Sequence, residues 1–443
     1  MPFACPTPRP NRMAAAVIAA ACAFGPVHTA AAQTAPSAAP AASPAPAGAA
    51  PAAAAAPAAP ASWFDTLKFS AQVDAGVVIN PYSPGDGLNF GQSFTDRSNS
   101  VLLNQLLLTA TRPLDPKATD YDFGFKIQGM YGTDARYTHF LGIWDYVTNQ
   151  RTQVDLVEAN VLIHTPWLTD GGIDFKLGLF STPMGYETID PSTNPFYTHS
   201  YIFNFALPFK QSGGYAVVHL SPNIDVYGGA DTGENTTFGA NGDNNTAAAG
   251  MLGLGLTLLD GNLTILGLSH FGPETARRAF PNADCCGRYE NDIVVTYKAT
   301  PALTLVTEAA WVHDDYFMAD AYGAAQYASY AWNDQITLNA RAEVFRDQNG
   351  FFVAAFPNSL GPVNALGGFP YTSISGGKTT YGALTLGFTY KPTVPAPISG
   401  LAIRPEIRWD TALNGTNPFN SNLGGTKSTN NSELISADVI LSF

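Results

Sequence analysis

The sequence predicts an all-β fold: a transmembrane, antiparallel up-and-down β-barrel of about 16 strands, with short periplasmic turns and long external loops. Three features predict it: repeated segments in which polar and apolar residues alternate, connections that alternate between short and long, and an N-terminal segment typical of exported proteins. No run approaches the roughly 20 apolar residues that a membrane-spanning helix needs. Strands are therefore the expected membrane-crossing elements.

The N-terminal segment has the parts of an export signal. Arg9 and Arg12 precede an apolar run at 13–24, and three alanines at 30–32 form a small-residue cleavage site. We expect residues 1–32 to be a cleaved signal peptide that exports the chain.

The next segment, 33–62, consists almost entirely of Ala and Pro with a few Ser residues. Such a composition cannot bury a core, and Pro keeps it extended. We expect a periplasmic linker here, followed by the barrel at 63–443.

Charge excludes one class of partner. Charged residues make up 13% of the chain and its net charge is −13; removing Arg9 and Arg12 gives −13 − 2 = −15. Nucleic-acid binding needs a basic surface, so no nucleic acid is expected.

Alternation of period two, which places successive side chains on opposite faces of a strand, recurs from Leu67 to the last residue. The expected strands are 67–77, 102–111, 121–128, 154–164, 173–180, 215–221, 224–232, 251–259, 263–271, 292–299, 303–312, 335–345, 381–391, 401–410 and 433–443.

Fifteen is an odd number of strands, whereas bacterial outer-membrane barrels have an even number. The segments 303–312 and 335–345 would both run outward, so one inward strand must lie between them. The available segment is 326–332, and it brings the count to sixteen. A barrel of this width is too wide for side chains to fill, which predicts an aqueous lumen.

The segment 401–410, LAIRPEIRWD, shows the expected inside-out pattern most clearly. Arg404, Glu406, Arg408 and Asp410 occupy every second position and should face the lumen, while Trp409 should face a membrane interface. Pro405 has no backbone N–H to donate to a neighbouring strand, so we expect a local irregularity or an interruption of strand pairing there.

The last strand ends in Phe443 after a regular alternation. This ending resembles the C-terminal signature of outer-membrane barrels that the barrel-insertion machinery reads. The expected partners are therefore that machinery, outer-membrane lipid and lipopolysaccharide.

Three segments resemble the recurrent patterns of the OmpL-like β-barrel porins: GLFSTPMGYETID at 178–190, ARAEVFRDQNG at 340–350, and LGFTYKP with IRPEIRWD at 386–392 and 403–410. The likeness covers most of the chain after the linker. It implies a Gram-negative outer-membrane porin and says little about the solute.

The connection 181–214 is among the longest, and in general porins the corresponding loop narrows the pore. By this resemblance Glu187 and Asp190 are candidates for an acidic side of a constriction that faces basic residues of the wall. Opposed charges would create a transverse field. The alternative is that the loop residues only stabilise a surface loop.

The basic side would comprise Arg341, Arg404 and Arg408, which share the strand parity of the lumen. The alternative is that these arginines only neutralise Glu343 and Glu406. The complete set of candidate pore-lining residues is Glu187, Asp190, Arg341, Glu343, Arg404, Glu406, Arg408, Asp410 and Lys126.

No catalytic or metal-binding motif stands out in the sequence, so we expect no enzymatic activity, cofactor or metal. The adjacent Cys285 and Cys286 lack the spacing of a zinc site and are interpreted as a strained disulfide or an inert loop tip.

The leading hypothesis is passive diffusion of small hydrophilic solutes or ions through a lumen narrowed by the loop 181–214. A substrate-selective channel or a loop-plugged receptor is the alternative, and an outer-membrane enzyme with its site at the rim is a third. The solute, the ion selectivity and the oligomeric state, including a homotrimer, stay open.

Overall fold

The computed structural model describes residues 63–239, 241–420 and 428–443. The described residues belong to two units: a single 3-10 turn, η2 (Trp63–Thr66), and the chain from Leu67 to Phe443. The predicted signal peptide and linker, 1–32 and 33–62, lie outside the described residues. No helix of the described part is long and apolar enough to cross a membrane.

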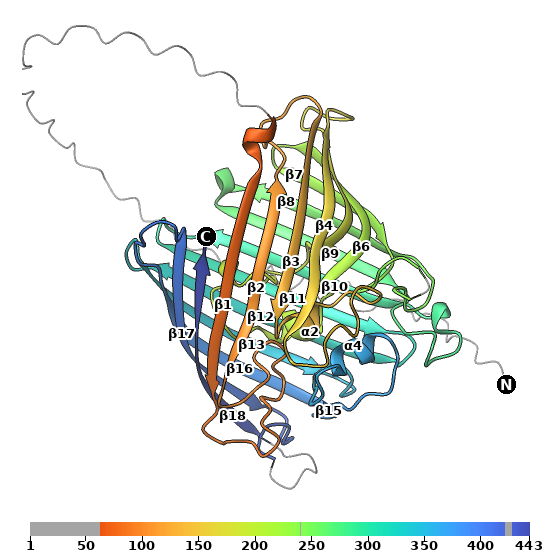
Figure 1. The fold of residues 1–443 in the computed structure, drawn as a ribbon, viewed down its shortest axis with the longest axis vertical. Helices are drawn as coiled ribbons and strands as arrows, with labels where there is room; N and C mark the ends of the chain where they lie inside the picture. Colours follow the sequence, from red (N-terminus) through yellow and green to blue (C-terminus); the bar gives the residue numbers. More distant parts are fainter. Residues whose placement is uncertain (1–62, 240, 421–427) are drawn as a thin grey trace, which may run out of the picture. The chain divides into compact units, whose positions relative to one another are not determined.

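Sixteen antiparallel strands of the second unit close into a barrel (Figure 1). They are β1 (Lys68–Ile79), β2 (Ser100–Arg112), β3 (Asp122–Gly132), β4 (Gln153–Thr165), β5 (Ile173–Ser181), β6 (Lys210–Ser221), β7 (Ile224–Asp231), β8 (Ala249–Leu258), β9 (Leu263–Gly272), β10 (Arg288–Lys298), β11 (Leu303–Asp314), β12 (Ala319–Ala331), β13 (Ile336–Asp347), β16 (Thr379–Tyr390), β17 (Gly400–Ala412) and β18 (Asn431–Ser442).

Each strand pairs with its neighbours in sequence, and β1 closes the ring against β18. The predicted count of sixteen is confirmed, including the strand inferred from parity. That strand, β12, begins earlier than the predicted segment 326–332. The prediction missed its first half because this Ala- and Tyr-rich stretch shows no polar alternation. β6 likewise begins at Lys210, five residues before the expected start at 215, and its first residues pair with β5. The sequence did not show this start because Gly213 and Gly214 interrupt the alternation of polar and apolar residues.

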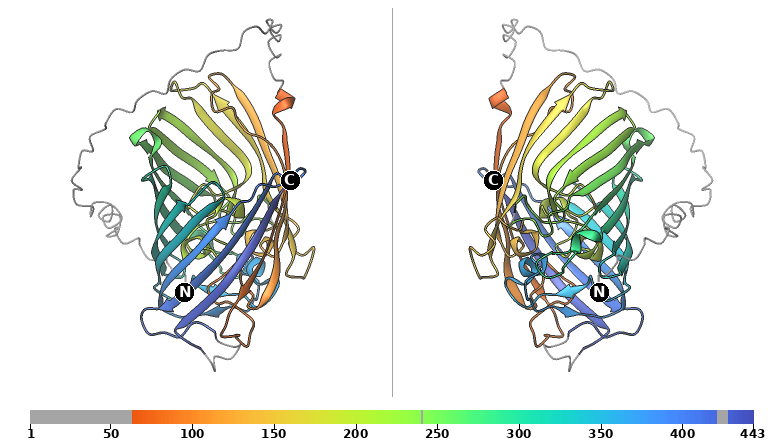
Figure 2. Two further views of the ribbon diagram at one scale, coloured as in Figure 1. Left: turned by 90° about the vertical axis from the view of Figure 1, so that its left-hand side faces the viewer. Right: turned by 90° about the vertical axis from the view of Figure 1, so that its right-hand side faces the viewer.

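The connections differ at the two ends of the barrel (Figure 2). One end carries short turns and both ends of the barrel chain, where Phe443 and Ala71 exchange backbone hydrogen bonds. The other end carries long connections, one of which contains α4 (Gly361–Leu366) and the small sheet of β14 (Ala354–Ala355) and β15 (Ile374–Ser375). The connection 315–318 is the short exception at this end.

Strand β17 has the two faces that its sequence predicts. Arg404 and Arg408 are buried inside the barrel, whereas Ile407 and Trp409 are 58% and 45% exposed on the outer wall. Its pairing with β16 stops after Gly387↔Glu406 and resumes at Tyr390↔Ile403. The interrupted rungs include Pro405, so the expected irregularity is present.

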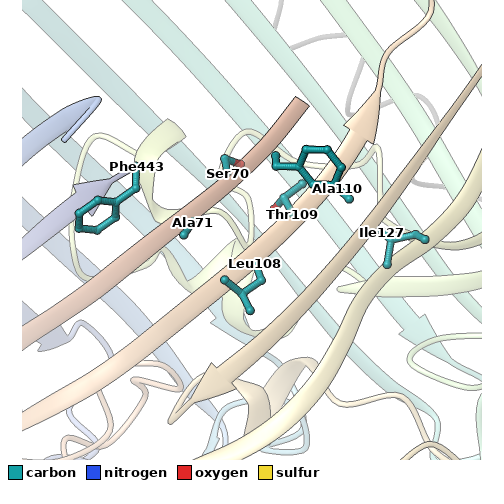
Figure 3. A pocket seen from close by; sticks show the side chains of 8 residues that line it. Ser70, Ala71, Leu108, Thr109, Ala110, Ile127 and Phe443 are labelled. Carbon is teal, nitrogen blue, oxygen red and sulfur yellow. The ribbon is translucent and has the colours of Figure 1, made fainter. Parts of the chain in front are cut away.

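The outer wall carries a shallow apolar groove beside the C-terminus (Figure 3). Ala71 and Ala110 form its floor, and the larger side chains of Leu108, Ile127 and Phe443 surround them. This groove belongs to the apolar band that an outer-membrane barrel turns toward lipid.

The orientation of the two faces can be tested by placing the same charge on each. Leu254 lies on the outer face of β8 and is 44% exposed, so Leu254→Arg should lower the free energy of unfolding in lipid vesicles by about 2–4 kcal/mol. Val217→Arg, on the inner face of β6, is the matched control and should have a much smaller effect. Equal effects in denaturant titrations would contradict the assignment of faces.

Candidate pore constriction

The connection between β5 and β6, residues 182–209, folds into the lumen and is named the constriction loop. It contains η3 (Pro191–Thr193) and α3 (Tyr201–Phe205). The side chain of Ser200 accepts a hydrogen bond from the backbone N–H of Phe203, which fixes the start of α3. A local hydrogen bond therefore defines where this helix of the loop begins.

One side of the constriction loop is apolar and packs on an apolar area of the lumen wall. Met184, Ile202 and Leu207 of the loop share one buried cluster with Val306 and Tyr327 of β11 and β12. Other wall residues of this cluster are Leu268, Val294, Ala310, Val312, Ala321, Ala325, Phe345, Tyr381, Ala383 and Ala412. Full burial of a large apolar side chain contributes about 1.5–3 kcal/mol, so this contact holds the loop against the wall.

Glu187 is the ionic centre of the contact between loop and wall. Its Oε1 accepts hydrogen bonds from Arg341 Nη1 at 2.7 Å and from the Tyr327 hydroxyl at 3.1 Å. Its Oε2 accepts one from the Ser200 N–H at 3.0 Å and lies 2.8 Å from His199 Nδ1. A loop carboxylate is thus paired directly with a wall guanidinium.

Charges on the wall extend this pairing along β13 and β17. Arg341 and Arg408 both contact Oε1 of Glu343, each at 3.2 Å. Arg408 also pairs with Asp410 at 2.8 Å and donates to the carbonyl oxygen of His199 at 2.7 Å. The alternating charges neutralise one another while they bind the backbone of the loop.

The next positions of β17 hold the middle of the loop. Glu406 accepts a hydrogen bond from the backbone N–H of Tyr197 at 2.8 Å. Arg404 donates to the carbonyl oxygen of Asn194 at 2.7 Å and forms an ion pair with Asp438 of β18. These contacts fix a loop segment that has no regular secondary structure.

The start of the loop is held by two wall carboxylates. Asp292 of β10 accepts a hydrogen bond from the Gly185 N–H at 3.0 Å, and Glu308 of β11 accepts one from the Tyr186 N–H at 2.9 Å. Asp292 is absent from the sequence-based candidates. Asp292 lies two positions before Val294 on β10, so both side chains point to the same, inner face. This alternation could have identified Asp292 from the sequence.

The protonation of Glu187 follows from its surroundings. Burial alone would raise its pKa, but the nearby charge of Arg341 and the hydrogen bonds from His199 and Ser200 outweigh burial and lower the pKa to about 2 from an ordinary 4.5. The carboxylate is therefore ionised at neutral pH, where it attracts Arg341.

The wall opposite this contact has a different character. Lys126 of β3 lies 3.0 Å from Glu158 of β4, and Lys176 of β5 lies 4.0 Å from the same residue. The two lysine side chains are 31% and 25% exposed, and Lys176 lies 5.8 Å from the centre of the Tyr215 ring. Two cations share one carboxylate here, so this solvent-accessible area has a local charge of +1.

The candidate residues from the sequence thus fall into three groups. The contact between loop and wall brings together Glu187, Arg341, Glu343, Arg404, Glu406, Arg408 and Asp410. Asp190 instead accepts a hydrogen bond from Gln72 at 3.0 Å, and Lys126 lies on the separate basic area. Glu187 and Arg341 are in contact, whereas the predicted field required them to face each other across the pore; a transverse field stays a prediction.

Long connections also meet one another at their end of the barrel. Asp96 of the first connection pairs with Arg136 at 2.9 Å and with Arg151 at 2.5 Å, both from the second. Arg136 also donates to the carbonyl oxygens of Asn358 and Ser359 in the connection before β16. Three connections are therefore joined around one buried aspartate.

The cysteines lie at η5 (Ala283–Cys285), in the connection between β9 and β10. The Sγ atoms of Cys285 and Cys286 are 2.9 Å apart, and their predicted roles stay predictions. Within the described part of the chain, no three His, Cys, Asp or Glu side chains are arranged to hold a metal ion.

The fold and the folded-in loop define the protein class as a channel-type outer-membrane barrel. The chain belongs to the family described as "Putative beta-barrel porin-2, OmpL-like", whose model matches residues 66–443. A search of curated proteins found no significant match. Family and fold together make the protein an outer-membrane porin.

Solved structures show the same barrel at low sequence identity. An anion-selective porin from Comamonas acidovorans is 10% identical with a TM-score of 0.53, covering 85% of this chain and 99% of its own. OmpF of Salmonella typhi in complex with daunomycin is 10% identical with a TM-score of 0.50, at 85% and 97% coverage. The channel DcaP of Acinetobacter baumannii is 12% identical with a TM-score of 0.48, also at 85% and 97%.

Removing the charge of Glu187 tests its part in holding the loop. Glu187→Gln leaves Arg341 buried without one of its two carboxylate partners and should lower the free energy of unfolding by about 3 kcal/mol. Glu433→Gln, at an exposed position of β18, should change it by less than about 0.5 kcal/mol. Equal stability of the two variants in urea titrations would contradict the role of Glu187 in holding the constriction loop against the wall.

The low pKa of Glu187 predicts a pH dependence of that difference. Because the folded state binds the proton more weakly, the stabilisation is fully present above about pH 4.5 and decreases as the pH falls toward 2. The difference between wild type and Glu187→Gln should therefore shrink over this range, as urea titrations at pH 6, 4, 3 and 2 would measure. A constant difference would show that the carboxylate charge does not matter.

Proposed function

We propose that the protein is a porin for passive diffusion of small hydrophilic solutes or ions, through a lumen that the constriction loop narrows from one side. The supporting observation is the asymmetry of the lumen. The loop covers the wall from β10 to β13 with buried contacts, and Phe203 and Phe209 also pack on Met130 and Val157 near the long-connection ends of β3 and β4. On the remaining inner surface of β3 to β7, the side chains of Lys126, Lys176, His219 and Asp225 are 25–34% exposed. The solute path is therefore assigned to the wall from β3 to β7.

Ion preference is proposed to come from the charges on that wall. Arg341 and Arg408 have fully buried side chains that are neutralised by carboxylates, so they contribute little field to a passing ion. Lys126 and Lys176 reach solvent and share Glu158. These lysines, rather than the arginines, should attract anions to the middle of the path.

A solute-selective channel is the second candidate, and the joined long connections favour it. Asp96, Arg136 and the carbonyl oxygen of Asn358 tie three of them together at one mouth. Restricted access at a mouth favours recognition of particular solutes over free diffusion.

The two candidates differ in how flux depends on solute concentration. The chain from Gln33, refolded and inserted in a planar bilayer, should give stable conductance steps, and its solute flux into vesicles should rise linearly with concentration. Saturation at millimolar solute would instead support the selective channel. A folded barrel with no current would overturn both candidates.

The role of the lysines can be measured by the reversal potential in a salt gradient. Lys126→Gln with Lys176→Gln removes two positive charges from the path and should raise the permeability of cations relative to anions by roughly twofold to fivefold. Lys378→Gln, at an exposed position of a long connection, is the control and should change the ratio little. An unchanged ratio in the double variant would refute the assignment.

Residues 1–32 are proposed to be a cleaved signal peptide, 33–62 a periplasmic linker and 63–443 the barrel. Phe443 is proposed to be read by the barrel-insertion machinery, with lipid and lipopolysaccharide around the outer wall. Homotrimerisation is compatible with the fold, and the protein is proposed to have no enzymatic activity.

A further inference from the structure

Four titratable side chains form a continuous row across four consecutive strands. His164 of β4 lies with Nδ1 2.6 Å from Oδ1 of Asp174 on β5. His219 of β6 lies with Nε2 3.3 Å from the other oxygen of Asp174 and with Nδ1 2.7 Å from Asp225 of β7. We name these four residues the His-Asp row.

The row lies on the inner face of the barrel close to the short turns. His219 and Asp225 are register partners on adjacent strands, and both are separated by an even number of residues from the inward Tyr215 and Tyr227. The side chains of His219, Asp174 and Asp225 are 31–35% exposed, so they lie at the water-accessible surface of the lumen.

The turn between β4 and β5 is shaped around the row. A Cβ atom on Gly171 would lie 2.6 Å from Cβ of His219, and one on Gly172 would lie 2.3 Å from the carbonyl oxygen of Thr165 and 2.9 Å from Cε1 of His164. Gly172 has a positive φ of 71°, and its carbonyl oxygen accepts the N–H of His219 at 3.1 Å. Side chains at these two turn positions would displace the histidines.

Charged side chains of β3 and β5 near the row are paired, and Asp170 of the turn before β5 is exposed. On β3, Asp122 is the register partner of His164, and Arg112 of β2 neutralises it at 2.7 Å. On β5, Lys176 follows Asp174 on the same face and lies near Glu158.

The aromatic neighbours on β6 and β7 are the phenols Tyr215 and Tyr227. Both remain neutral through the range in which histidine titrates. The row therefore differs from its neighbours in carrying two imidazoles, the side-chain type that can change charge near neutrality.

We propose that the His-Asp row is a proton-dependent selectivity filter at the short-turn mouth of the pore. With both histidines protonated, the four side chains sum to zero charge; with both neutral, they sum to −2. A more negative mouth enriches cations and repels anions, so selectivity changes with pH while the backbone of the barrel stays fixed. Histidine is the side chain suited to this change between pH 5 and 8.

This inference rests on the proposed passive pore, and it assigns to that pore a specificity-determining element separate from Lys126 and Lys176. The two sets lie on the same wall at different depths. The lysines set a permanent positive charge, and the row adds a negative charge that protons cancel.

The test is the reversal potential of the refolded full pore in a potassium chloride gradient, measured at pH 5 and pH 8. The wild type should show a rise of roughly threefold in the cation to anion permeability ratio between pH 5 and 8. The variant with His164→Gln and His219→Gln should lose this rise. Should it fail to fold, each single variant should lose about half.

His313→Gln is the matched control. His313 lies between Asp320 at 2.9 Å and Asp315 at 3.1 Å, as His219 lies between two aspartates, but it is on the outer face of β11. This variant should keep the wild-type rise.

Three outcomes would overturn the inference: no rise in the wild type, a full rise in the double variant or in both single variants, or loss of the rise in His313→Gln. Each of these leaves a conducting pore, whereas absence of any current would overturn the proposed function itself.

Discussion

The buried ionic contact between Glu187 and Arg341 is the interaction on which the interior of this barrel depends. A sixteen-stranded barrel encloses more space than its own inward side chains can fill. The constriction loop occupies part of that space, and it must satisfy its backbone groups away from bulk water. Arg341, Arg404, Arg408, Glu343 and Glu406 provide the donors and acceptors for this purpose.

The lumen consequently has two unlike sides. From β10 to β13, apolar wall residues such as Val306 and Phe345 pack against the constriction loop much as a soluble protein core packs. From β3 to β7, the loop packs on Met130 and Val157 near the long connections, and the side chains of Lys126, Lys176 and His219 remain partly exposed. The arginines and carboxylates that the sequence predicts for a pore bind the constriction loop, whereas Lys126 and Lys176 lie on the proposed solute path.

The fold could be predicted from the sequence because a barrel strand encodes its two faces by parity. β17 shows this directly, and even β12, whose pattern is weak, could be inferred because an antiparallel ring requires an inward strand between β11 and β13. The candidate site was predictable only in part. Parity identified Arg341 and its neighbours as inward, but it cannot show whether an inward charge meets water or a folded-in loop.

The apolar area on β10 to β13 and the His-Asp row could not be predicted from the sequence, because each forms only when segments distant in the sequence come together. The apolar area on β10 to β13 reads as ordinary strand alternation with small residues, such as Ala310 and Ala325, on the inner face. Its role appears only when Met184 and Leu207 pack on it. The His-Asp row joins positions from four strands, so no local spacing reveals it, and each histidine considered alone is an ordinary wall residue.

The proposed solute path follows the wall from β3 to β7, while the constriction loop seals the opposite side of the lumen. It is tested most directly by cysteine accessibility during single-channel recording, in a background where Cys285→Ser and Cys286→Ser remove the native thiols of the barrel. The account predicts that a charged methanethiosulfonate reagent rapidly reduces the current through Lys176→Cys and leaves Ala325→Cys, which is 2% exposed, unchanged. Equally fast modification of Ala325→Cys would contradict it.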